Sequence, residues 1–319
     1  MNNRLIYFNE KEHKYTDDLA NPYISCTTLV SEYINKFDEE LMSERCAKAG
    51  RNGNPKYAGK TATQLKSEWA TTRILACARG NERHDFLENT IKDSNGYKKI
   101  EGTRYINDRI YTIADILEDD SYGRVDLDFF VKTGIKEKYP QIYILIKYYV
   151  EQGYKIYSEV CAFNYDCKIS GLIDLLLIKD DTFVIIDWKT NKADITWTSG
   201  YYQKDAEGNL TDNFVEKNEY FKYPLVHIPD SIGHHYTLQL SIYNYLVEGF
   251  GLKHISNMLC HIRYETHTDD SKILKILPEL YGKEKVDFVP INYLKDDVKL
   301  LFEHYYSKNV VGNQTQLMI

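Results

Sequence analysis

Residues 171–190 read GLIDLLLIKDDTFVIIDWKT, and this stretch decides the fold of the chain. Two apolar runs rich in β-branched side chains flank the polar pair Asp180-Asp181, which predicts a β-hairpin with a two-residue turn. In that register, the residue six before Asp180 lies opposite the residue six after Asp181. These residues are Asp174 and Asp187, so their carboxylates are predicted to face each other with Cβ atoms about 5 Å apart. A β-bulge would shift this register by one residue.

A lysine accompanies the two aspartates. Lys189 follows Asp187 by two residues and is therefore expected on the same face of the strand. Carboxylates that face each other in an apolar hairpin repel each other and lose hydration. A bound cation offsets both costs, so the pattern predicts a metal site with a lysine beside it. The competing interpretation is that the aspartates only form turns, because a D-x-K tripeptide is common by chance.

The composition sets limits on the class of protein. A chain of 319 residues forms one large domain or two small ones. Its 43% hydrophobic and 27% charged residues are typical of a soluble globular protein. The net charge of −7 provides no overall basic field, so any nucleic-acid site must be local or bridged by metal ions. The 28 tyrosines suit surfaces that contact bases, sugars or proteins, although packing is their commoner use.

The cysteines argue against two kinds of metal site. None of the six belongs to a C-x-x-C pair, which excludes a zinc ribbon and disfavours an iron–sulfur cluster. No signal peptide is recognisable, and the apolar runs are too short to span a membrane. We therefore expect reduced thiols in a cytoplasmic protein without a membrane partner.

The residues before the hairpin predict short strands followed by helices. Short strands are expected within 4–25. Helices are expected from Thr27 or Thr28 to about Lys36, from Thr63 to about Ile91, over 105–118 and over 139–153. Pro140 suits the first turn of the last of these helices. Residues 44–60 (ERCAKAGRNGNPKYAGK) combine five basic side chains with three glycines and a proline, which predicts a mobile loop or arch. This segment is interpreted either as a solvated surface loop or as a grip on phosphates.

The central and C-terminal parts predict a mixed α/β fold. Strands are expected at about 155–164, 168–178 and 183–189, an inserted loop or strap over 196–233, a helix over 235–250, a strand over 255–264 and a closing helix over 292–307. Both hairpin faces are apolar apart from the site residues, so helices should cover both faces of the sheet.

Further polar residues recur at helical spacing. Gly80, His84 and Glu88 share one face of the long helix, and Gln239 and Tyr243 share a face of a later one. Glycine at the first of these positions lets another segment approach closely, while the imidazole and carboxylate could reach a metal. Each set alone is ordinary, since a histidine on a helix is more often a surface or core residue than a ligand.

Taken in order, these motifs resemble one family. The motifs are GNERHDFLE (Gly80–Glu88, G-x-x-x-H-x-x-x-E), GLID (Gly171–Asp174, G-x-x-D), DWK (Asp187–Lys189, D-x-K) and QLSIY (Gln239–Tyr243, Q-x-x-x-Y). Their order resembles the RecB-like branch of the PD-(D/E)XK nuclease superfamily, which includes phage recombination exonucleases. The N-terminal text HKYTDDLANPYISCTTLV is also similar to phage members.

The resemblance implies a fold and a domain plan. The fold would be a PD-(D/E)XK (restriction-endonuclease-like) core, a mixed β-sheet flanked by helices, with an N-terminal helical or arch region. One nuclease domain would span 1–319, divided into N-terminal strands, helix and basic loop (1–79), catalytic core (80–265, with the insert at 196–233) and C-terminal strand and helix (266–319).

The resemblance also implies roles for individual residues. Asp174, Asp187, His84 and the Trp188 carbonyl would bind Mg²⁺, or alternatively Mn²⁺ because an imidazole is present. Lys189 would activate the attacking water and neutralise the phosphate, Gln239 and Tyr243 would position substrate or the lysine, and Glu88 and Glu159 would support the site. DNA contacts are expected from Arg45, Lys48, Arg51, Lys56, Lys60 and Lys192.

The family's pattern is not complete in this chain. Ile173 stands where the family name has its proline, and the cysteines that staple an iron–sulfur cluster in some relatives are absent, so no such cluster is expected. The implied function is a metal-dependent DNA exonuclease of the phage recombination type, acting in the host cytoplasm. A structure-specific or single-strand endonuclease, a non-catalytic nucleic-acid-binding module and a hydrolase of small phosphate compounds remain alternatives. A single-strand annealing protein as partner and a ring-shaped oligomer are possible in this family.

Overall fold

The predicted hairpin forms in the middle of the sheet. The computed structural model describes residues 5–104, 107–119, 121–192, 194–205, 210–264 and 284–311. Strands β7 (Ile169–Lys179) and β8 (Thr182–Lys189) pair antiparallel, from Lys179 opposite Thr182 to Leu175 opposite Ile186. This is the predicted register. Asp180 enters the turn with a φ of 53°, a left-handed conformation that aspartate adopts more readily than most residues.

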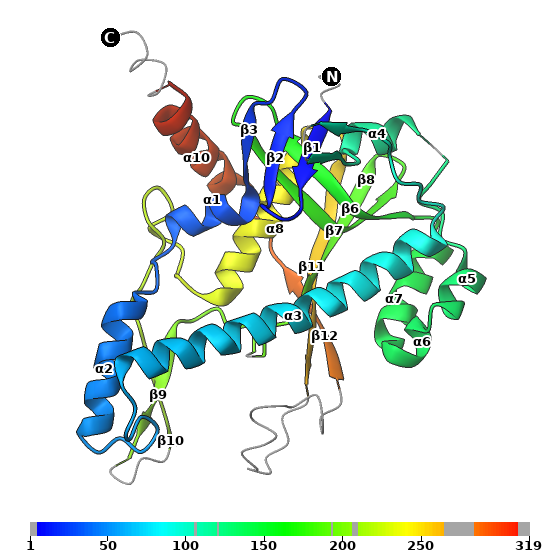
Figure 1. The fold of residues 1–319 in the computed structure, drawn as a ribbon. Coiled ribbons are helices and arrows are strands. Elements are labelled where there is room, and N and C mark those ends of the chain that lie inside the picture. Colours follow the sequence, from blue (N-terminus) through cyan, green and yellow to red (C-terminus); the bar gives the residue numbers. More distant parts are fainter. Residues whose placement is uncertain are drawn as a thin grey trace.

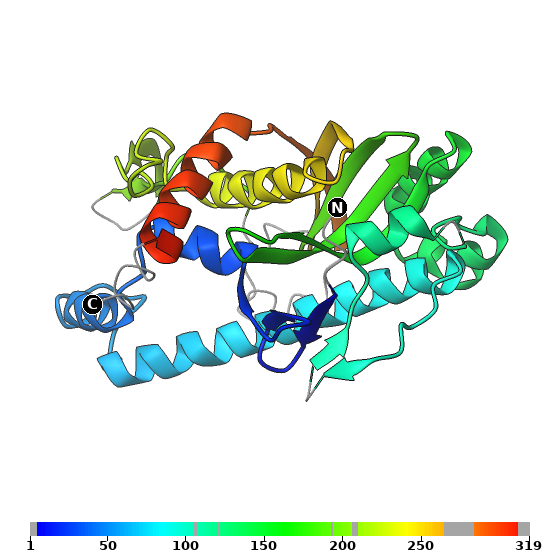
Figure 2. The same cartoon turned by 90° about the horizontal axis from the view of Figure 1, so that it is seen from above.

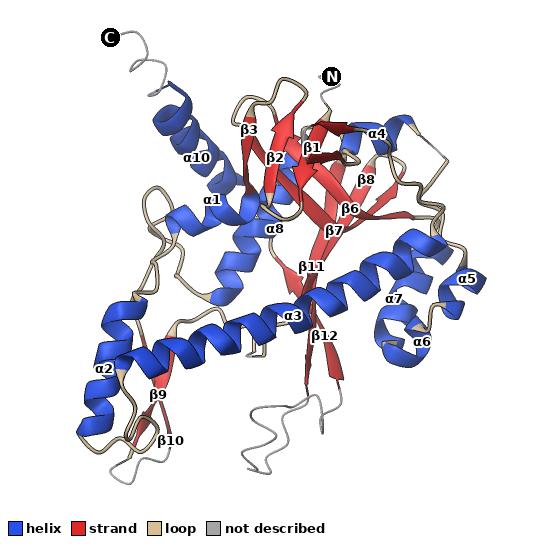
Figure 3. Cartoon of the chain, viewed as in Figure 1, coloured by secondary structure: helices blue, strands red, loops and turns tan. Residues whose placement is uncertain are grey.

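The hairpin belongs to a mixed sheet (Figure 1, Figure 3). The strand order is β12-β11-β8-β7-β3-β2-β1-β5-β4, and β6 pairs with the opposite edge of β7. β8 is antiparallel to β7 but parallel to β11, which makes the sheet mixed. The remaining strands are β1 (Ile6–Asn9), β2 (Lys14–Asp17), β3 (Pro22–Ser25), β4 (Thr103–Arg104), β5 (Asn107–Arg109), β6 (Lys155–Asn164), β11 (Lys253–Tyr264) and β12 (Glu284–Ile291).

Helices precede, interrupt and follow the central strands. They are α1 (Cys26–Tyr33), α2 (Glu39–Arg51), α3 (Ala62–Ser94), α4 (Ile113–Glu118), α5 (Leu127–Lys132), α6 (Ile135–Lys138), α7 (Pro140–Glu151), α8 (Ile232–Glu248) and α10 (Lys295–Tyr306), which ends in a π-helical turn (Ser307–Val311). In the described part of the chain, none of the helices has both the length and the apolar run that crossing a bilayer requires.

Each face of the central strands has its own hydrophobic core. Leu176 and Ile185 pack with α1, α8 and α10 on one face, whereas Leu177 and Ile186 pack with α3 and α7 on the other. Figure 2 shows the same division, with α3 along one side of the sheet and α8 with α10 along the opposite side. The predicted α/β class, with a mixed sheet covered by helices on both faces, is therefore confirmed.

The long helix α3 is confirmed. Its start is fixed by a capping box, in which Thr61 Oγ1 accepts a hydrogen bond from the Gln64 N–H (3.2 Å) and Gln64 Oε1 accepts one from the Thr61 N–H (2.9 Å). Gly80 lies within the helix without breaking it. A Cβ atom at Gly80 would lie 3.0 Å from Thr190 Oγ1, so the glycine allows α3 to cross close to the end of β8.

The prediction of a mobile loop over 44–60 is wrong for its first half. Residues as far as Arg51 belong to α2, because Asp38 caps the helix by accepting a hydrogen bond from the Leu41 N–H (2.9 Å). Acidic residues in the first turn and basic residues in the last turn also favour this helix. A Cβ at Gly50 would lie 2.2 Å from the Tyr57 carbonyl oxygen, so this glycine serves close packing and not flexibility.

Two other predictions need correction. The helix expected over 105–118 begins only at Ile113, where Thr112 and Asp115 form a capping box, and Asn107–Arg109 form β5 instead. Residues 105 and 106 lie outside the described residues. The insert at 196–233 contains a separate hairpin of β9 (Gly200–Lys204) and β10 (Leu210–Glu216). Of the predicted C-terminal unit, β12 and α10 are present, and 266–283 and 312–319 lie outside the described residues.

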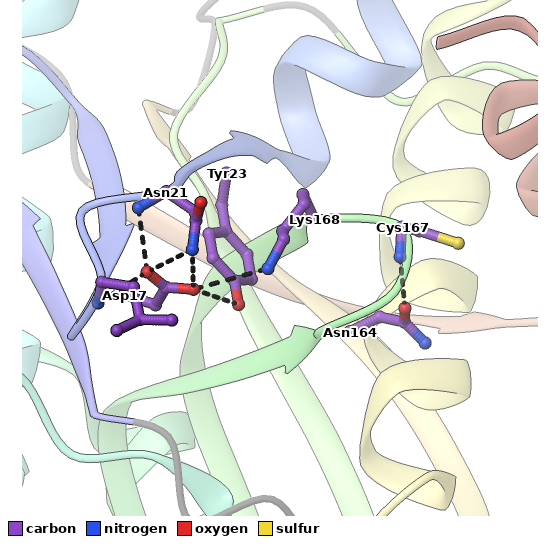
Figure 4. Close-up of polar contacts among 7 residues, drawn as sticks. Asp17, Asn21, Tyr23, Asn164, Cys167 and Lys168 are labelled. Carbon is purple, nitrogen blue, oxygen red and sulfur yellow. Dashed lines mark hydrogen bonds and ion pairs between the residues drawn. The ribbon is translucent and has the colours of Figure 1, made fainter. Parts of the chain in front are cut away.

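A buried carboxylate fixes the strand that borders the site (Figure 4). Asp17 Oδ1 accepts hydrogen bonds from the N–H groups of Leu19 (3.0 Å) and Asn21 (2.9 Å), and Oδ2 accepts one from Lys168 Nζ (3.4 Å). Burial acts to raise the pKa of Asp17, but the hydrogen bonds from Asn21 and Leu19 outweigh it and hold the pKa below its ordinary value. Asp17 thereby joins the β2–β3 turn to the start of β7, where β3 pairs in parallel.

Candidate active site

A cleft opens where β7 changes its neighbour. One edge of β7 pairs with β8 over Leu175–Lys179 and with β3 over Ile169–Ser170. Between these two stretches, residues 171–174 have no strand partner on that edge among the described residues. Gly171, Leu172 and Asp174 line a cleft of about 1330 Å³ there, together with residues of α3, the end of β8 and α8.

The two predicted aspartates lie at the mouth of this opening. The β7–β8 ladder ends at Leu175 and Ile186, so Asp174 and Asp187 come one position later, where the strands separate. The predicted register is right, but the ladder does not continue through the aspartates. Beyond the ladder, a side chain links the two strands, because the Trp188 N–H donates a hydrogen bond to Asp174 Oδ2 (2.8 Å).

The electrostatics indicate that the aspartates act on each other. Asp174 is largely buried, and Asp187 is only 2% exposed. Burial raises the pKa of Asp174 to about 6, and the charge of Asp187 adds to the increase, against the opposing effects of His84, Lys189 and the Trp188 N–H. His84 Nδ1 lies 3.8 Å from Asp174 Oδ2. The imidazole of α3 and the carboxylate of β7 therefore meet in the cleft, as predicted.

Lys189 joins the aspartates to α8. Its Nζ lies 2.5 Å from Asp187 Oδ2 and donates a hydrogen bond to Gln239 Oε1 (3.3 Å). Burial acts to lower the pKa of Lys189, but the charges of Asp187 and Asp174 outweigh it and raise the pKa above its ordinary value. The lysine is therefore a buried positive charge, held in place on two sides.

The Q-x-x-x-Y motif of α8 and the G-x-x-D motif of β7 are in contact with each other. Gln239 Nε2 donates a hydrogen bond to Tyr243 Oη (3.1 Å), which fixes the amide that receives Lys189. The ring of Tyr243 lies against Gly171, where a Cβ atom would come within 2.6 Å of Tyr243 Cε1 and 2.9 Å of Cys26 Sγ. Glycine at this position is thus required by the packing of the tyrosine.

Glu159 occupies a strained position beside Asp174. It lies opposite Asp174 in the β6–β7 register, between the pairs Ser158–Leu175 and Val160–Ile173, and its φ is +56°. A glutamate rarely adopts this left-handed conformation, which costs about 1–3 kcal/mol and is found mostly at functional sites.

A second group of charges surrounds this glutamate. Burial raises the pKa of Glu159 well above its ordinary value, with Asp174 and Glu88 adding to the increase and Lys92 opposing it. Glu88 itself forms an ion pair with Lys92, one turn later on α3. The structure thus brings both predicted supporting carboxylates, Glu88 and Glu159, to the cleft beside Asp174.

The donor set suits a hard divalent cation. Asp187 Oδ2 is buried, and its close neighbour is the Lys189 ammonium, 2.5 Å away. Two carboxylates and one imidazole are ligands that Mg²⁺ or Mn²⁺ accepts. Within the described residues, however, no three His, Cys, Asp or Glu side chains form a closed ligand set. The Trp188 N–H is used by Asp174, and the role of the Trp188 carbonyl stays a prediction.

Three residues of the site were not predicted from the sequence. Lys189 Nζ lies 4.6 Å from the centre of the Tyr236 ring, whose hydroxyl donates to Asn191 Oδ1 (3.3 Å). His261 is paired in register with Lys189, and its Nε2 lies 2.7 Å from the Asn191 carbonyl oxygen. The sequence held a signal for two of them. Tyr236 lies one turn before Gln239 on the same helix, and His261 is a histidine within the apolar strand β11.

The predicted DNA-contacting residues do not gather at the site. Lys192 lines the cleft, next to the end of β8. Arg45, Lys48 and Arg51 lie on α2, and Lys56 and Lys60 in the turns after it, and none of these five lines the cleft. Lys60 is paired with Glu68 (2.7 Å). Their role in DNA binding stays a prediction.

Comparisons of the chain with models of protein families, with curated proteins and with solved structures found no match. The functional argument therefore rests on the residues and their geometry.

Proposed function

We propose that this protein is a divalent-metal-dependent DNA exonuclease of the PD-(D/E)XK type that acts in phage recombination or DNA processing. The observation that supports it most is the buried, positively charged Lys189, held between Asp187 and Gln239 at the point where two central strands separate. The ammonium group pairs with Asp187 and lies 4.6 Å from the centre of the Tyr236 ring, next to the predicted metal ligands. It is suited to a substrate that carries negative charge.

The side chains divide the work of phosphodiester hydrolysis. Asp174, Asp187 and His84 would hold the cation, which when bound neutralises phosphate charge and makes a water more acidic. Lys189 would place its charge on the scissile phosphate or orient the attacking water. Gln239 holds Lys189 in position, and Tyr243 in turn holds Gln239. Glu159 and Glu88 would accept a proton or complete the set of oxygen ligands.

The size of the cleft favours a polymer over a small phosphate compound. Its volume of about 1330 Å³ exceeds the 300–1000 Å³ that is typical of pockets for small ligands. Basic side chains line the cleft at the N-terminal strands (Lys11, Arg109) and near the ends of β8 and β11 (Lys192, Arg263). Of these, Arg109 is paired with Asp115, and Arg263 with Asp194 and Asp287. A chain with several phosphates could contact both groups at once.

Linear and closed circular DNA distinguish the exonuclease from an endonuclease. Wild-type protein with Mg²⁺ should degrade linear duplex DNA, spare covalently closed circles and lose all activity in chelator. Cutting of closed circles would replace the exonuclease by an endonuclease with the same chemistry. Degradation of neither substrate, with either Mg²⁺ or Mn²⁺, would contradict the proposed activity.

His84 gives a test of the metal site. The change His84→Ala removes one of several predicted ligands, so the protein should need a higher concentration of metal and recover part of its activity at high Mn²⁺. Titration of activity with Mn²⁺ measures this shift, and Glu82→Ala, an exposed residue of α3 that does not line the cleft, is the control. An inactive variant with unchanged metal affinity would make His84 a substrate contact, and full activity at low metal would remove it from the site.

A further inference from the structure

The part of α3 that leads away from the cleft is exposed all round. Its first turns pack against α2 through the buried Leu65, and from Gly80 onward it packs against the sheet. Between these anchors, every residue of the stretch 71–78 is exposed. This stretch carries the exposed apolar side chains Ile74 and Leu75, and adjacent exposed apolar side chains are a feature of binding surfaces.

One face of this stretch continues the wall of the active site. Residues spaced by three or four positions lie on one helix face, and Cys77, Gly80, His84 and Glu88 all line the cleft. Arg73 comes one turn before Cys77 on this face and is exposed. The face therefore leads outward from the predicted metal ligand His84 to the positively charged side chain of Arg73.

An aromatic pair lies at the far end of the same face. Trp69, one turn before Arg73, contacts Phe37 edge to face, with ring centres 5.9 Å apart. Phe37 is 68% exposed, so a face of its ring is open to a ligand. Fifteen residues separate Trp69 from His84, which corresponds to about 22 Å along the helix.

We propose that single-stranded DNA extends from the cleft along this face, with a phosphate at Arg73 and a base stacked on the Phe37–Trp69 pair. This inference rests on the proposed function. An exposed aromatic pair beside a cation suits unpaired bases, because their faces are free to stack. A strand rises about 3.4 Å per nucleotide when it is stacked as in a duplex and about twice that when it is extended, so about three to seven nucleotides are needed to cover the roughly 22 Å to the pair.

Length-dependent binding tests the track. Fluorescence anisotropy with Ca²⁺ in place of Mg²⁺ would compare labelled oligothymidines of about two and about twenty nucleotides, one too short to reach the pair even when extended and one long enough. Phe37→Ala and Arg73→Ala should each weaken binding of the long strand by about fivefold or more, and leave the short one unchanged. Leu75→Ala is the matched control, because Leu75 is exposed on the opposite side of the same turn. An equal effect of Leu75→Ala, or none of Phe37→Ala and Arg73→Ala, would overturn the proposal.

The native thiols provide an independent readout. Cys77 is exposed on the proposed track, while Cys46 is partly exposed on α2. The long oligothymidine should slow alkylation of Cys77 by iodoacetamide severalfold without protecting Cys46, as measured by peptide mass spectrometry. Hydrolysis of linear DNA without protection of Cys77 would overturn this track but not the nuclease. A protein that neither hydrolyses nor binds DNA would contradict both the track and the proposed nuclease activity.

Discussion

The change Lys189→Ala is expected to lower hydrolysis of linear duplex DNA by about a hundredfold or more, because the loss of one positioned charge at a reacting centre usually costs that much. Metal binding should remain or become tighter. Lys189 Nζ is 2.5 Å from Asp187 Oδ2 and competes with a cation for this carboxylate. Steady-state rates and a metal titration of the same variant separate the two effects.

The matched control for this change is Lys179→Ala. Lys179 lies on the same hairpin but at its turn, opposite Thr182, away from the cleft. The control should keep wild-type activity, and both variants should show a wild-type circular dichroism spectrum. Residual activity of Lys189→Ala above about a tenth of wild type would mean that this lysine does not take part in the chemistry.

The hairpin could be predicted from the sequence because its signals are local. Two apolar runs and the pair Asp180-Asp181 determine the register, and the register determines which side chains meet. The helix spacing of His84 with Glu88 and of Gln239 with Tyr243 is likewise readable, since helical periodicity places each pair on one face. What the sequence could not supply was the distance between these faces.

The features that were missed depend on tertiary contacts. The ladder ends at Leu175 because β7 passes from one neighbouring strand to another, and the positive φ of Glu159 falls beside Asp174 on the other edge of β7. The glycines of residues 44–60 suggested mobility, but Gly50 is needed where Tyr57 approaches the backbone of α2. In both cases the residue type was visible in the sequence, and its neighbour was not.

The second large effect is expected at Asp174, as a change in metal-dependent stability. A divalent ion that binds only the folded protein should stabilise it by about 1.4 kcal/mol at ten times its dissociation constant, a rise of roughly 2–5 °C in melting temperature. Asp174→Asn removes one ligand and the repulsion with Asp187. The variant should therefore melt at or above wild type in chelator, while its shift with Mg²⁺ or Mn²⁺ largely vanishes. Asp181→Asn, at the exposed turn of the same hairpin, should keep the full shift.

The same carboxylate predicts a dependence on pH in the absence of metal. The pKa of Asp174 in the folded protein is about 6, above its ordinary value of 3.8. Between these values the folded state binds more protons than the unfolded state, so its stability falls as pH rises from about 4 to about 6. The difference in melting temperature between Asp174→Asn and wild type in chelator should therefore grow over this range and level off above it. A difference that is flat with pH would mean that the pKa of Asp174 is not raised in the folded protein. An undiminished metal shift in Asp174→Asn would mean that Asp174 and Asp187 do not share a cation.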